Sequence, residues 1–222
     1  MSLYHYLLIY AFTHSLIHSF THSLIYSFTH CILAPFPTSK QQDTADAMRK
    51  LRNSELERKT VQEFKATRKY PVYLVLDNVR SLNNVGSAFR TADAFLIKGI
   101  CLCGITARPP HRDIQKTALG ATESVDWSYY PQTVKAVNEL KESGYRIISV
   151  EQTEGDVSLP DFTPSRDEKY ALVFGHEVKG VQQEIVDMSD LCVEIPQEGT
   201  KHSFNISVSV GIVLYHFYYH LR

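Results

Sequence analysis

Three short polar segments carry the side chains whose types and spacing are suited to chemistry. They read N-x-G-x-x-x-R from Asn84 to Arg90, F-G-x-E-x-x-G from Phe174 to Gly180, and I-P-x-x-G-x-x-x-S-x-N-x-S from Ile195 to Ser207. Amides, carboxylates and an arginine bind hydroxyl and phosphate groups, and glycines let a ligand approach the backbone closely. The chain has neither the dinucleotide fingerprint G-x-G-x-x-G nor a P-loop, so this chemistry is not that of a common nucleotide-binding loop.

The first two segments also have simpler interpretations. Asn83 or Asn84 can cap a helix that begins there. Glu177 can hold a ribose hydroxyl, or it can cap the helix that follows it, where an anionic group is favoured. His176 has the chemistry of a general base, although a solvated histidine is the commoner outcome at such a position.

The third segment combines a turn with a helix start. Pro196 and Gly199 indicate the turn, and Ser203 is a natural N-cap for an apolar helix. Asn205 lies inside that apolar start, where its amide is costly unless it is hydrogen-bonded. We therefore expect Asn205 to have a specific partner.

The elements that must position these segments alternate between strands and helices, which predicts an α/β fold: a mostly parallel sheet flanked by helices. The expected strands are residues 72–76, 99–103, 125–129, 145–150, 170–174 and 191–195, and the expected helices are 84–94, 131–143, 182–188 and 203–220. Ligands of such sheets lie beyond the carboxyl ends of the strands. Three loops qualify, 77–84, 175–181 and 196–203, and each overlaps one of the three polar segments.

A basic stretch precedes the first strand. Residues 49–69 hold eight Lys or Arg and three Glu, and the pairs Ser54/Glu57 and Thr60/Glu63 have the capping-box spacing of a helix that runs to about Arg68. We interpret residues 48–70 as a basic helical arm that is either a solvated surface or a contact for RNA phosphates. The candidate contacts are Arg49, Lys50, Arg52, Arg58, Lys59, Arg68 and Lys69, joined by Arg90 and by Arg108 and Arg112 of a proline-containing loop.

Residues 1–47 differ in composition from the rest. The first 39 contain no Lys, Arg, Asp or Glu but five of the ten histidines, in copies of an eight-residue repeat (THSLIHSF, THSLIYSF). The segment lacks the basic start of a secretory signal and the roughly 20 apolar residues of a membrane span. His14, His18 and His22 are four residues apart and would share one face of a helix, but a metal site is a weaker interpretation than a repeat without a ligand. We expect a poorly ordered extension, or a translation artefact with a functional start at Met48.

Whole-chain composition limits the remaining possibilities. The net charge is −1 for 222 residues, so any nucleic-acid contact depends on a local basic patch. The four cysteines include no C-x-x-C pair, so no zinc knuckle is expected, and their sparse use suits a cytoplasmic protein.

Taken together and in this order, the three segments resemble the three motifs of the SpoU (TrmH) family of RNA ribose 2′-O-methyltransferases, in the SPOUT superfamily. The resemblance covers about residue 51 to the C-terminus. It implies a knotted methyltransferase domain over residues 71–222, with a C-terminal deep trefoil knot of a kind that general folding rules disfavour. It also implies a homodimer, an S-adenosylmethionine cofactor, no metal, and tRNA or rRNA as substrate.

The resemblance assigns roles to single positions. It implies catalytic roles for Arg90, Asn84, Ser203 and Asn205. It implies that the cofactor is held by Phe174, Gly175, Glu177, Gly180, Ile195, Gln197, Ser203 and Asn205. Gln197 and Phe204 replace the Met and Leu of many members, which bears on cofactor fit more than on chemistry.

Two other functions stay open. One is an RNA-binding protein with this fold and no catalysis, and the other is a methyltransferase that acts on an RNA base. A membrane role would rest only on residues 1–33 and is a weaker alternative.

Overall fold

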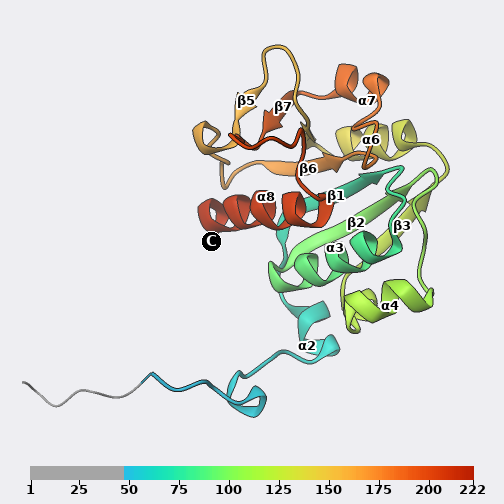
Figure 1. Cartoon of the computed structure of the whole chain (residues 1–222). Coiled ribbons are helices and arrows are strands. Elements are labelled where there is room, and N and C mark those ends of the chain that lie inside the picture. The colour runs from blue at the N-terminus through green and yellow to red at the C-terminus, as the bar shows by residue number, and fades with distance from the viewer. Residues whose placement is uncertain (1–47) are drawn as a thin grey trace, which may run out of the picture. The chain divides into compact units, whose positions relative to one another are not determined.

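The structure is a computed structural model, and it describes residues 48–222 (Figure 1). Arg58–Arg222 forms one compact unit, and residues 48–57 belong to a separate one. Residues 48–57 contain a short 3₁₀ turn, Asn53–Glu55, beside which Arg49 pairs with Glu55 at 2.8 Å. The predicted extension, residues 1–47 with its histidines, lies outside the described residues, and the predicted domain division stays a prediction.

Seven parallel strands form one sheet in the order β3-β2-β1-β6-β4-β7-β5. The predicted α/β class with a parallel sheet is therefore confirmed. The central strands are the apolar runs of the sequence, and they are buried on both faces, as expected when helices cover both sides. The bounds are β1 Tyr70–Asp77, β2 Ile97–Cys103, β3 Trp127–Tyr130, β4 Tyr145–Val150, β5 Val157–Ser158, β6 Lys169–Phe174 and β7 Leu191–Glu194.

Helices cover the two faces of the sheet and form two hydrophobic clusters with it. One cluster joins the sheet to α3 (Leu82–Ala94), α4 (Arg112–Ala118), α5 (Ala121–Ser124), α8 (Ile206–Leu221) and to Phe64 of α2 (Val61–Ala66). The other joins it to α6 (Thr133–Glu142) and α7 (Gln183–Met188). No helix in residues 48–222 is both long and apolar enough to cross a bilayer.

Three helix starts differ from the sequence-based expectation. Ser81, not Asn83 or Asn84, caps α3 by accepting from the Asn84 amide at 3.3 Å. Asn205, not Ser203, caps α8 by accepting from the Ser207 amide at 2.8 Å. Helix α6 begins at Thr133, after the predicted Pro131 start. The first two differences free the Asn84 side chain and fix that of Asn205.

The basic arm is less helical than predicted. Thr60 and Glu63 form the expected capping box, but α2 ends at Ala66 because Thr67 is already extended. The box predicted at Ser54 and Glu57 is not formed, because the turn there is closed by Glu55. The short elements α4, α5, β5 and the 3₁₀ turn Leu159–Asp161 were not expected, since none is long enough to show a clear period.

Parallel pairing brings the carboxyl ends of β1, β6, β4 and β7 to one edge of the sheet. The register aligns Leu76 with Phe174 and Val150 with Val193. The three polar loops therefore meet at this edge, as the sequence predicted, and a fourth loop after Val150 joins them.

Candidate active site

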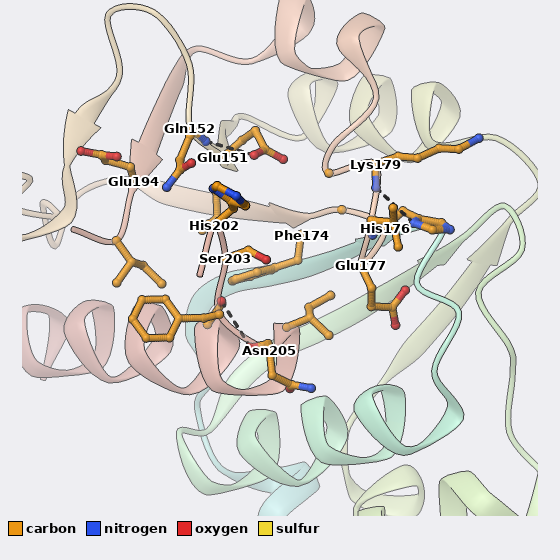
Figure 2. A pocket seen from close by; sticks show the side chains of 18 of the residues that line it. Glu151, Gln152, Phe174, His176, Glu177, Lys179, Glu194, His202, Ser203 and Asn205 are labelled. Atoms are coloured by element: carbon orange, nitrogen blue, oxygen red, sulfur yellow. Dashed lines mark hydrogen bonds between the residues drawn. The ribbon is translucent and has the colours of Figure 1, made fainter. Parts of the chain in front are cut away.

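A cavity of about 570 Å³ opens at the carboxyl edge of β4, β6 and β7 (Figure 2). It is lined by the ends of those strands, by the loop after β6, and by the segment that leads into α8. Small-molecule sites have volumes of roughly 300–1,000 Å³, so the cavity has the size of a cofactor site. All eight residues predicted for cofactor binding line it: Phe174, Gly175, Glu177, Gly180, Ile195, Gln197, Ser203 and Asn205.

Two glycines let the loop after β6 fold closely on itself. His176 and Gly180 exchange backbone hydrogen bonds of 2.9 and 2.8 Å across this loop. A Cβ on Gly175 would lie 2.1 Å from backbone atoms of Gly180 and Val181, and Gly180 has a φ of +68°. No other residue type fits at Gly175 without opening the loop, so the cavity wall depends on it.

Two carboxylates from the strands on either side of β6 hold the end of this loop. Glu151, directly after β4, accepts from the Val181 amide at 2.8 Å. Asp77, the fully buried last residue of β1, accepts from the Gln182 amide at 3.0 Å. Successive amides are thus bound from two sides, which fixes the loop before any ligand binds.

Glu151 and Gln152 line the cavity, but they were not among the predicted site residues. The signal was present, because Val150 ends a predicted strand and ligands of parallel sheets lie beyond every carboxyl end at the same edge.

A chain of hydrogen bonds connects the three polar segments. Glu177 accepts from the Asn84 side-chain NH₂ at 3.2 Å, and the Asn84 side-chain oxygen Oδ1 accepts from the Asn205 side-chain NH₂ at 3.3 Å. Each asparagine amide thus uses its NH₂ toward one neighbour and its oxygen toward another. The expected partner of Asn205 is Asn84.

Glu177 is bound by the start of α3 rather than by the helix after it. Its two oxygens accept from the backbone amides of Arg80 and Ser81 at 3.0 and 2.9 Å. The alternative that Glu177 caps the following helix is therefore wrong. Partial burial raises the pKa of Glu177, but these hydrogen bonds outweigh it and leave the pKa below its ordinary value of 4.5.

Arg90 lies apart from this network. It follows Asn84 by six residues, which on a helix is about 9 Å along the axis and a different face. Arg90 is exposed and does not line the cavity. Its side chain has no hydrogen bond or ion pair with any residue of the described part, 48–222. Its guanidinium is available to a group that approaches from outside.

The other predicted RNA contacts are mostly exposed. Arg58, Lys59, Arg68 and Arg112 are exposed, as are Lys50 and Arg52 of the first unit. The exposed Arg108 lies over the Tyr129 ring at 4.3 Å. Lys69 is different, because its ammonium donates to the carbonyls of Phe64 and Thr67 and lies over the Phe64 ring. Burial lowers the pKa of Lys69, so this side chain serves the fold.

Comparison with known proteins identifies the family. The SpoU rRNA Methylase family matches residues 71–215, which is most of the described chain. The chain belongs to the SpoU family. Its α/β fold with a parallel sheet is the SpoU fold, which implies the C-terminal trefoil knot.

Individual curated relatives match about two thirds of this chain. The chain is 32% identical over 148 residues to a 23S rRNA (guanosine-2′-O-)-methyltransferase of Neisseria meningitidis, covering 65% of this chain and 56% of that protein. It is 28% identical over 148 residues to a tRNA (guanosine(18)-2′-O)-methyltransferase of Borreliella burgdorferi, covering 67% and 66%. The chain therefore spans less than two thirds of either relative.

A solved structure shows the same fold. An AdoMet-bound rRNA methyltransferase from Sinorhizobium meliloti superposes with a TM-score of 0.65 at 24% identity, over 72% of this chain and 60% of that one.

The first prediction concerns Glu177. A carboxyl whose pKa is lowered in the folded state stabilises the fold above its ordinary pKa and loses this contribution as pH falls through the lowered value. Glu177→Gln should lower the free energy of unfolding by on the order of 1 kcal/mol at pH 7 and flatten its decline below about pH 4.5. Urea titrations at pH 7 and pH 4 measure both; parallel pH curves for the variant and wild type would contradict it.

The second prediction concerns Gly180. An alanine there must adopt a left-handed backbone and displace the Glu151 carboxylate, 2.1 Å from the new Cβ. We expect Gly180→Ala to lower the free energy of unfolding by about 1–3 kcal/mol. Gly199→Ala is the matched control, because Gly199 has open space around it and no positive φ. Equal urea midpoints for the two variants would argue against the loop geometry.

Proposed function

We propose that this SpoU-family protein transfers a methyl group from S-adenosylmethionine to a ribose 2′-hydroxyl of a structured RNA, either tRNA or rRNA. The observation that carries the proposal is the Glu177–Asn84–Asn205 chain, which joins all three motifs at the edge of a cofactor-sized cavity. The activities named for the two SpoU relatives, on 23S rRNA and on tRNA, support it.

The cavity residues fit the cofactor. Gly175 and Gly180 line the wall without side chains that would fill the cavity, and Phe174 and Ile195 supply apolar surface. Loops around Phe174, Gly175, Gly180, Ile195 and Gln197 would hold it, with Ser203 and Asn205 at the entry to α8. When bound, the cofactor supplies a methyl group on a sulfonium, which is electrophilic enough to need no metal.

The chain's own contribution is alignment and electrostatics. In the transfer, the ribose oxygen would form a bond to the methyl carbon while the sulfur–carbon bond breaks, which would leave a neutral thioether, and the hydroxyl proton would pass to water. Residues must place the hydroxyl in line and stabilise negative charge on its oxygen. Arg90 can serve both purposes, because its guanidinium can bind an RNA phosphate and its positive charge favours the alkoxide. Arginine stays protonated in proteins, so Arg90 is not the proton acceptor.

Calorimetric titration with S-adenosylmethionine is the first test. Micromolar binding, followed by 2′-O-methylated nucleosides in digests of treated tRNA or rRNA, is the expected result. Absence of binding by the folded protein would favour the non-catalytic RNA binder. Methylated bases in the digest would favour the base methyltransferase.

The third prediction separates Arg90 from the cofactor cavity. Arg90→Ala should lose at least 100-fold in kcat, while its dissociation constant for S-adenosylmethionine stays within about twofold of wild type, because Arg90 does not line the cavity. Unchanged turnover would refute the role. Arg90→Lys, which keeps the charge but not the fork, should be intermediate.

The assembly we propose is a homodimer that uses α8. Five large apolar side chains along the start of α8 and its length are 36–57% exposed: Phe204, Val208, Ile212, Tyr215 and Tyr219. The spacing of three or four residues places Val208, Ile212, Tyr215 and Tyr219 on one face of the helix, and Phe204 directly precedes the N-cap. A contiguous apolar stripe of this kind is typical of an interface, and a second copy of this chain is the occupant we propose.

The fourth prediction tests this stripe. Ile212→Glu should shift the mass in solution from dimer to monomer, measured by light scattering after gel filtration, because a buried unpaired charge is costly. Val61→Glu is the control: Val61 is similarly exposed but lies on α2. A dimer that survives Ile212→Glu together with Tyr215→Glu would remove α8 from the interface.

A cytoplasmic location is part of the proposal. Cys101, Cys103 and Cys192, the cysteines within the described residues, are all unpaired. Free thiols are typical of a reducing compartment, where tRNA and rRNA are modified.

A further inference from the structure

A second hollow lies beside the cofactor-sized cavity. It has a volume of about 300 Å³ and is lined by Arg80, Ser81, His176, Glu177 and Val178. His176, Glu177 and Val178 also line the first cavity, so the loop after β6 is the wall between the two. In Figure 2, His176 and Glu177 point away from the space between Phe174 and Ser203. Arg80 was not among the predicted site residues.

The backbone that carries Arg80 is fixed at four successive amides. Asn78 donates to the Cys103 carbonyl at 3.2 Å and Val79 to the Thr106 hydroxyl at 2.9 Å. Arg80 and Ser81 donate to Glu177 at 3.0 and 2.9 Å. A side chain on so constrained a backbone loses less entropy when it binds a ligand.

The Arg80 guanidinium is available for such a ligand. It is exposed and has no hydrogen bond or ion pair to any residue in the range 48–222. The carboxylate next to it, Glu177, is already bound by three N–H donors and is therefore a weak competitor. The hollow consequently presents a free, bidentate donor to an anion.

The remaining walls suit the rest of a nucleotide. The His176 ring is held because its Nδ1 accepts from the amides of Val178 and Lys179 at 3.0 and 3.3 Å. Its Nε2 therefore carries the proton, and the flat ring is fixed in place. Val178 is 83% exposed, an apolar side chain with no packing role of its own. Imidazole rings and apolar groups support RNA bases, as arginine supports their phosphates.

We infer that this hollow is an RNA subsite, in which Arg80 binds a backbone phosphate of the acceptor strand and His176 and Val178 support a neighbouring base. The inference rests on the proposed function, because it places the acceptor RNA across the loop from the cofactor. Methyl transfer requires acceptor and cofactor to meet, and a shared wall of three residues provides that proximity.

The test compares charge variants of the full chain. The probe is a fluorescein-labelled 20-nucleotide poly(U) RNA, and anisotropy gives its dissociation constant from 50 to 200 mM KCl. Arg80→Gln should weaken binding about fivefold and reduce the slope of log K against log salt by about 1. Arg80→Lys should recover part of the affinity, because it keeps the charge without the fork.

Lys98→Gln is the matched control. Lys98 is exposed near the start of β2, at the opposite edge of the sheet from the site, and its loss removes the same charge. We expect its RNA affinity and salt slope to match wild type. Arg80→Gln should also bind S-adenosylmethionine as wild type does, because Arg80 does not line the larger cavity.

Each outcome separates the subsite from the proposed function. If wild type binds the RNA and Arg80→Gln binds it equally well with the same slope, the subsite is wrong and the methyltransferase stands. Equal weakening by Lys98→Gln would show that only total charge matters, which also overturns the subsite. If wild type binds neither this RNA nor S-adenosylmethionine, both proposals fail together.

Discussion

The site depends on one carboxylate at the junction of two loops. Glu177 follows β6, and the groups that bind it, the amides of Arg80 and Ser81 and the side chain of Asn84, follow β1. The two strands are neighbours in the sheet, so their loops meet, and a carboxylate there offers one oxygen to each of the two amides that precede α3 and a charge that the helix start favours. The asparagine that this interaction orients then binds Asn205. Without Glu177, the hydrogen bond that connects the second motif to Asn84 of the first motif would be lost.

Carboxylates also bind backbone amides at the other end of the loop after β6. Asp77 and Glu151 stand at the ends of β1 and β4, and they bind successive amides of the segment that closes the loop. Three carboxylates thus add to the two backbone hydrogen bonds that His176 and Gly180 exchange across this loop. The consequence is a rigid wall with a hollow on each side, one lined by a mixture of polar and apolar residues and one carrying an arginine. Such preorganisation is what a two-substrate transfer requires.

Much of this was accessible from the sequence, for physical reasons that particular residues show. The runs VYLVL and YALVF predicted buried parallel strands, and the edge rule then predicted which loops meet. The partners of Asn84 and Glu177 could not be predicted, since they are set by tertiary contacts between residues 93 positions apart. Helix starts were also missed. Several polar residues near the starts of α3 and α8 could act as the N-cap. Which one does so depends on the tertiary contacts of the others: the Asn84 side chain binds Asn205, and Ser81 caps α3.

Helix α8 couples the site to the proposed assembly. Asn205 accepts from the first turn of this helix and donates to Asn84, so the position of α8 and the connection between motifs are set by one side chain. The apolar stripe runs along the same helix from Phe204 onward. A second copy that covers the stripe would restrain α8 along its length and thereby hold Asn205 in place. Asn205 therefore belongs both to the cavity and to the helix that carries the proposed interface.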